Sequence, residues 1–180
     1  MNSMKNKKIY NLILAAMFMA LGLLLPLVTA QIRYIGNMLL PMHIPILLCG
    51  LICGWKYGAA VGFITPLLRS ALFGMPVLFP NAIGMAFELA AYGFLIGFIY
   101  DRLKKKGLLS IYLSLVAAIL GGRLIWGVAR TLLFGAGGEP FTFSLFITNA
   151  FITAIPGIVL QLILIPAIMI ILKLIKKRKV

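Results

Sequence analysis

The stretch that decides the fold class is residues 9–30, IYNLILAAMFMALGLLLPLVTA, which carries no charged side chain. About 20 apolar residues are enough for a helix to cross the hydrocarbon core of a bilayer. The stretch follows Lys5, Lys7 and Lys8, as the core of a signal peptide would. It exceeds the roughly 7–15 residues of such a core, and there is no small-x-small cleavage site with a mature soluble protein behind it. We therefore expect a permanent membrane helix.

The composition extends this interpretation to the whole chain. Hydrophobic residues make up 63% of the 180 residues and charged residues 11%, with a mean hydropathy of +1.11. Ordinary soluble domains have about 45–50% and about 25%, respectively. So few charges cannot cover a surface that faces water, which excludes an ordinary soluble protein.

Six apolar runs divide the chain, at about residues 9–30, 39–55, 57–73, 79–100, 108–134 and 142–172. The second and third are separated only by Gly54, Trp55 and Lys56, where glycine favours a short turn. No linker or internal repeat interrupts the pattern. The sequence predicts an all-α integral membrane protein in which residues 1–180 form one domain of six transmembrane helices.

The basic residues give this domain an orientation. Lysine and arginine total 17 against 3 acidic residues, for a net charge of +14. Because cytoplasmic loops are enriched in lysine and arginine, we attribute this charge to topology rather than to nucleic-acid binding. Six spans with both termini in the cytoplasm place most basic residues inside: Lys5, Lys7, Lys8, Lys56, Arg102, Lys104, Lys105, Lys106, Lys173, Lys176, Lys177, Arg178 and Lys179.

Catalytic and metal-binding patterns are missing from the sequence. It contains no phosphate-binding G-x-x-x-x-G-K-[ST] loop, so the chain does not use ATP through that device. His43 is the only histidine, and Glu88 is the only acid within the predicted spans. Without a nucleophile beside a general base, or a set of metal ligands, we expect no enzyme and no metal site.

Four charged side chains nevertheless fall inside the spans: Arg69, Glu88, Arg123 and Arg130. Each costs about 2.5–3.5 kcal/mol at mid-bilayer, so such residues usually face a protein interior or a wet cavity. Glu88 and Arg123 lie at similar depth in neighbouring predicted spans, and we expect them to pair. This pair has a purely structural alternative as well as a ligand-binding one.

Arg69 and Arg130 then remain without an acidic partner near the outer side. Guanidinium groups bind carboxylates through two parallel hydrogen bonds, which favours an anionic ligand; snorkelling to the interface is the alternative. Further polar or aromatic side chains gather toward the outside and complete the candidate site, although each also suits a helix cap or an interhelical hydrogen bond: Asn37, His43, Asn81, Trp126 and Asn149.

Several stretches resemble a known family. A basic N-terminus, the alanine pair Ala16 and Ala20 in the first span, six spans and no ATPase motif are similar to the substrate-binding (S) components of energy-coupling factor (ECF) vitamin transporters. Residues 38–50 (MLLPMHIPILLCG), 62–69 (GFITPLLR), 86–88 (AFE) and 122–126 (GRLIW) resemble the members assigned to pantothenate.

The resemblance implies a subunit that binds one vitamin with high affinity from outside a bacterial plasma membrane. It would dock on a transmembrane coupling subunit through Ala16 and Ala20, and two cytoplasmic ATPase partners would use the ATP, so this chain needs no cofactor. The first outer loop, residues 31–37, would gate the site.

The charges suit pantothenate. Its carboxylate would bind Arg69 or Arg130, and its amide and hydroxyls would bind Glu88, Asn81 and Asn149. Pyridoxine or nicotinate in the same family, and a standalone carrier coupled to protons through Glu88 or His43, remain alternatives.

The topology makes a direct prediction. A cysteine placed at Lys104 should react with a membrane-impermeant maleimide only after the cytoplasmic side of the membrane is opened, because that loop is expected inside. Labelling of intact cells at this position would contradict six spans with both termini in the cytoplasm.

Overall fold

The computed structural model describes residues 2–29, 39–104, 107–137, 146–148 and 152–178. Within these ranges the chain is helical and no strand occurs, as the sequence predicted. The elements follow one another in the order α1 (Asn2–Thr29), α3 (His43–Cys53), α4 (Trp55–Phe73), η1 (Leu78–Ala82), α5 (Ile83–Arg102), α6 (Leu108–Gly137) and α8 (Ile155–Arg178).

Each predicted span falls on one of these helices, with η1 continuing into α5. Within the described ranges, four stretches are long and apolar enough to cross a membrane: Asn6–Val28, Leu78–Arg102, Leu108–Leu133 and Ile155–Ile175. The helix α3 has only 11 residues, about 16 Å of length, roughly half of a bilayer core. Its residues are all buried except Ile52, so it lies inside the bundle rather than along the lipid.

The predicted start of the second span is wrong. The second span was expected from residue 39, but α3 begins at His43, because Leu40 adopts a left-handed backbone (φ 49°) and residues 41–42 form a turn. The sixth was expected from residue 142; α8 begins at Ile155 after a turn at residues 153–154, residues 146–147 are helical, and residues 142–145 and 149–151 lie outside the described ranges. The turn expected at Gly54 is confirmed: its φ of 97° suits glycine, and it separates α3 from α4.

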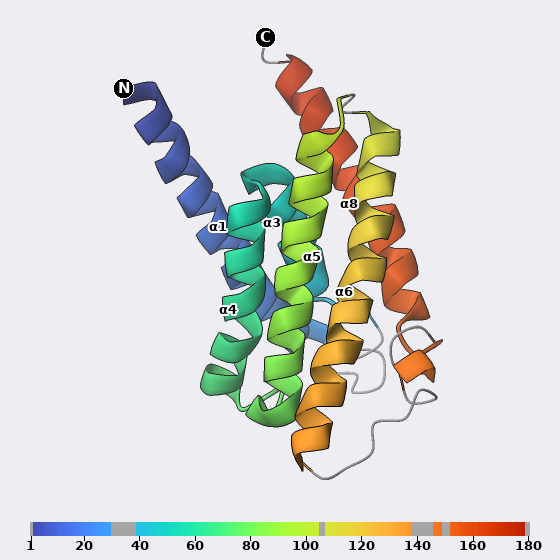
Figure 1. The fold of residues 1–180 in the computed structure, drawn as a ribbon. Coiled ribbons are helices and arrows are strands. Elements are labelled where there is room, and N and C mark those ends of the chain that lie inside the picture. Colours follow the sequence, from blue (N-terminus) through green and yellow to red (C-terminus); the bar gives the residue numbers. More distant parts are fainter. Residues whose placement is uncertain (1, 30–38, 105–106, 138–145, 149–151, 179–180) are drawn as a thin grey trace.

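The helix α5 is the centre of the bundle and contacts α3, α4 and α6. The helix α1 packs against α3 and α4, and α8 packs against α6 and α3. Figure 1 shows both termini, the α3–α4 turn and the α5–α6 connection at the same end of the molecule. The segments that carry most of the basic residues therefore gather at one end, as the positive-inside distribution requires.

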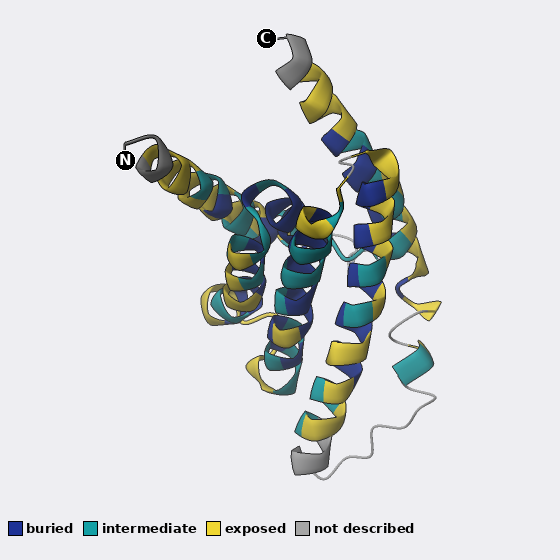
Figure 2. Cartoon of the chain, turned by 45° about the horizontal axis from the view of Figure 1, so that its top comes forward, coloured by how far each residue is buried: buried dark blue, intermediate teal, exposed yellow. Residues whose placement is uncertain are grey.

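Figure 2 shows buried residues facing inward between the helices and exposed residues outward, and many of the exposed residues are large and apolar. The helix α1 is the extreme case, since Ile9, Leu12, Met17 and Val28 are all more than half exposed. A soluble protein could not present such a surface to water, whereas lipid or a membrane partner covers it without cost.

Glycines bring α4 and α5 into backbone contact. A Cβ on Gly62 would lie 2.2 Å from the carbonyl oxygen of Leu89, and one on Gly93 would lie 2.2 Å from that of Gly58. Real side chains do not approach backbone so closely, so both positions require glycine for this packing. The close approach fixes the height of α5, and thereby of Glu88, in the bundle.

The contact predicts a clear effect on stability. Gly93→Ala should lower the midpoint of thermal unfolding in detergent by several degrees, because the added methyl group forces the helices apart at a cost of about 1–3 kcal/mol. Gly107→Ala is the matched control, since a Cβ there meets no atom within 4 Å. Equal midpoints for the two variants would show that this backbone contact is not needed.

Candidate functional site

A charged pair lies buried at the centre of the bundle. Arg123 of α6 donates a hydrogen bond from Nη1 to Oε1 of Glu88 on α5 at 2.9 Å, and both side chains are almost completely enclosed. The predicted pairing of these residues is confirmed. In a low-dielectric interior each charge needs such a partner, because an unpaired buried charge is strongly destabilising.

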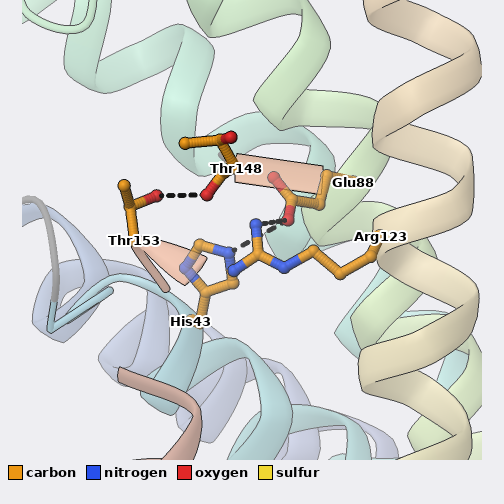
Figure 3. A network of polar contacts seen from close by, with 5 residues as sticks. All are labelled: His43, Glu88, Arg123, Thr148 and Thr153. Carbon is orange, nitrogen blue, oxygen red and sulfur yellow. Dashed lines mark hydrogen bonds and ion pairs between the residues drawn. The ribbon is translucent and has the colours of Figure 1, made fainter. Parts of the chain in front are cut away.

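His43 joins this pair from the first turn of α3. Its Nε2 lies 3.5 Å from the same Glu88 oxygen that accepts from Arg123, which is close enough for an electrostatic interaction but is not a hydrogen bond. The edge of the His43 ring meets the Tyr92 ring, with centroids 5.1 Å apart. Figure 3 shows the side chains of His43, Glu88 and Arg123 converging from α3, α5 and α6.

Part of this cluster has no hydrogen-bond partner among the described residues. The Nε and Nη2 atoms of Arg123 and both ring nitrogens of His43 are buried and unsatisfied in this sense. Each buried donor without an acceptor costs about 1–3 kcal/mol. In a guanidinium group, the Nε–H and Nη2–H bonds point the same way along one edge, and this edge matches the two oxygens of a carboxylate or phosphate.

A second polar group lies further toward the predicted outer side on the same face of α6. Arg130, seven residues after Arg123, donates from Nη1 to Oδ1 of Asn81 in η1 at 2.5 Å. Its guanidinium lies over the Trp126 ring at 5.2 Å, and Trp126 stacks on Phe146 at 6.2 Å between centroids. The structure thus brings together three of the predicted residues in a mixed polar and aromatic surface.

Two threonines near the cluster form a separate contact. Thr153 donates from Oγ1 to the carbonyl oxygen of Thr148 at 3.2 Å (Figure 3). This bond connects the turn before α8 to the segment that precedes it. Neither threonine stood out in the sequence.

Arg69 lies apart from both polar groups, between α4 and α1. It donates from Nη1 to the carbonyl oxygen of Leu23 on α1 at 2.7 Å, and its guanidinium lies over the Phe73 ring at 5.5 Å. It is 7% exposed, so it does not extend to the interface as a snorkelling side chain would. Its contacts tie α4 to α1 rather than to the cluster around Arg123.

The remaining predicted positions divide into two groups. Asn37, Asn149 and the expected gating loop at residues 31–37 lie outside the described residues. Ala16 and Ala20 are both exposed on α1, where a membrane partner has access to them. Among the described residues, no three side chains of the metal-binding types come together.

Sequence reasoning missed one contributor to the site, Phe146. Phe146 stacks on Trp126, but an aromatic residue near a loop is too common to signal this. Gln161 of α8 is fully buried, and neither atom of its amide has a hydrogen-bond partner among the described residues. The sequence shows it as a single amide within a long apolar run, deeper than the other polar residues.

The comparison with protein families supports a transport role for this arrangement. The family model described as "ECF transporter, substrate-specific component" matches residues 10–171. No curated protein and no solved structure matches the chain significantly. Because the family match spans most of the chain and every long helix, the protein belongs to the substrate-specific components of ECF transporters, which are multi-pass cell-membrane proteins and not enzymes.

Proposed function

We propose that this S component binds a small, water-soluble vitamin that carries one carboxylate, and that pantothenate is its substrate. Membership of the family gives the general role, a substrate-binding subunit of an ECF transporter. The observation that carries the finer proposal is the buried Nε–Nη2 edge of Arg123, which lacks an acceptor among the described residues.

A carboxylate is the chemical group that this edge suits best. Glu88 engages one terminal nitrogen of Arg123 through a single oxygen, which leaves two parallel donors for a ligand. Hydrogen bonds between ions are roughly twice as strong as neutral ones, and the low dielectric of the interior strengthens them further. A neutral vitamin such as pyridoxine would leave this edge without a charged acceptor.

The sequence assigned the carboxylate to Arg69 or Arg130, and the geometry favours Arg123 instead. Arg69 is occupied by a backbone carbonyl of α1. Arg130 contacts Asn81 and Trp126 on the predicted outer side of Arg123, where amide and aromatic groups suit the uncharged part of a solute. Pantothenate has an amide and two hydroxyl groups for that part of the site. Asn37 and Asn149 remain proposed contacts of the same part.

The partners follow from the same family role. The exposed pair Ala16 and Ala20 on α1 gives a smooth strip against which a transmembrane coupling subunit would pack closely. Two cytoplasmic ATPase subunits on that partner would supply the energy. We place solute entry at the end opposite the basic clusters, where η1 and the Arg130 group lie.

The carboxylate assignment is tested by changing the geometry of the donors. Arg123→Lys should weaken pantothenate binding in titration calorimetry by at least about tenfold, equivalent to about 1.4 kcal/mol, because lysine keeps the charge but loses the two parallel donors. Arg102→Gln is the control, since that exposed arginine ends α5 at the opposite, basic end. Thermal unfolding of each variant separates lost binding from lost folding.

Competition by other vitamins tests the substrate itself. Pantothenate should displace a bound label while riboflavin, thiamine, biotin, folate and pyridoxine do not. If nicotinate alone displaces the label, the substrate is a different carboxylate vitamin, and the protein keeps its role as a vitamin-binding S component. Tight binding of a neutral vitamin, with no effect of Arg123→Lys, would refute the carboxylate site.

The docking surface gives an independent prediction. Ala16→Leu together with Ala20→Leu should abolish co-purification of the co-expressed coupling subunit and ATPases, because larger side chains prevent close helix approach, while pantothenate affinity stays unchanged. Ala60→Leu is the matched control, an exposed alanine on α4. Retention of the complex by the double variant would place the partner on another surface.

A further inference from the structure

We propose that His43 takes up one proton when an anionic solute binds at Arg123, so that the site captures the anion together with a proton. This inference rests on the proposed function, because it needs an anion at Arg123. It adds a role for His43 that differs from ligand contact, namely to balance the charge of the occupied site.

The proposal depends on a single oxygen atom, Oε1 of Glu88. Oε1 of Glu88 accepts a hydrogen bond from Arg123 at 2.9 Å and also lies 3.5 Å from Nε2 of His43. Both Glu88 and His43 are about 2% exposed or less, so bulk water does not screen this arrangement. A proton on the imidazole would therefore have a carboxylate directly beside it.

The charges of the empty cluster cancel when His43 is neutral. Arg123 contributes one positive charge and Glu88 one negative charge. A bound carboxylate would leave one net negative charge enclosed by apolar helices, which is costly in a medium of low dielectric. A proton from the outer solution, bound by His43, restores neutrality. Histidine is the side chain best suited to this, because its charge changes most readily near neutral pH.

The proposed binding of a proton and an anion conserves atoms and charge. The proton binds at Nε2 of His43, and the imidazolium forms an ion pair with Glu88. Arg123 then shares its charge between Glu88 and the carboxylate on its Nε–Nη2 edge. No covalent bond forms or breaks. Protonation of Glu88 would balance the charge too, but it would sacrifice the existing ion pair with Arg123.

Further titratable groups lie on α3 and on the helices packed around it, among them Cys49 and Cys53 of α3. Tyr92 of α5 meets the imidazole through its ring. On α4, Arg69 donates to Leu23 and Tyr57 donates to the Lys8 carbonyl of α1. Other charged groups lie at distant ends of their helices or engage other side chains: Lys56 over Trp55, Arg130 with Asn81, and Lys173 near the end of α8.

The experiment counts protons in the full-length protein in detergent. Pantothenate is titrated calorimetrically at several pH values between about 6.5 and 8.5, in phosphate and in Tris, whose ionisation enthalpies differ. The difference between buffers gives the number of protons taken up. At the upper end of this range we expect about one proton per solute, with affinity falling about tenfold per pH unit. Pantothenol, the neutral alcohol analogue, should take up none.

The variants assign the proton to a residue. His43→Gln should bind pantothenate with no proton uptake and a flat pH profile, and His43→Asn serves as a second variant if the first unfolds. Asp101→Asn is the control and should keep the wild-type proton number, because Asp101 is 13 residues from Glu88 along α5, or about 20 Å.

The outcomes separate the two proposals. Tight pantothenate binding without proton uptake by the wild-type protein would overturn the role of His43 and leave the carboxylate site intact. If the His43→Gln variant still takes up one proton per bound pantothenate, the proton binds another group, such as Glu88. This outcome would also overturn the role of His43. If none of the carboxylate vitamins pantothenate, nicotinate, biotin and folate binds the wild-type protein, the carboxylate site fails and this inference fails with it.

Discussion

The ion pair between Arg123 and Glu88 is the constraint on which the interior depends. Two charges sit where apolar side chains surround them, and the cost of burying them is offset only if they stay in contact. The pair fixes the rotation of α6 about its own axis, because Arg123 must face α5. It thereby also sets the direction of Trp126 and Arg130, which follow on the same face of that helix.

The close packing of α4 and α5 makes this arrangement rigid. Gly62 and Gly93 let the two backbones touch, so α5 cannot slide along α4 without a clash. Helix association in membranes depends on such close packing, because lipid is as apolar as the side chains and gives no hydrophobic driving force. The helix α1, which packs against α3 and α4 with one side, presents a long apolar surface to lipid or a partner subunit.

A purely structural ion pair would use its donors more completely. Glu88 occupies only one nitrogen of Arg123, and His43 stands 3.5 Å from the shared oxygen without bonding to it. A group with spare donors, enclosed by three helices, suits an anion, because such a ligand would supply the acceptors that the described part of the chain does not provide. This is consistent with the substrate-binding role of the family.

The sequence by itself determined the membrane setting, the positions of the long helices, the likeness to S components and the pairing of Arg123 with Glu88. Hydropathy and charge are properties of the residues, and depth along a span follows from counting. Only the tertiary structure decided that Arg69 bonds to Leu23, that His43 lies beside Glu88 and which edge of Arg123 is left without an acceptor. Those contacts depend on how helices rotate and approach one another, which is set by packing between distant segments that no local pattern records.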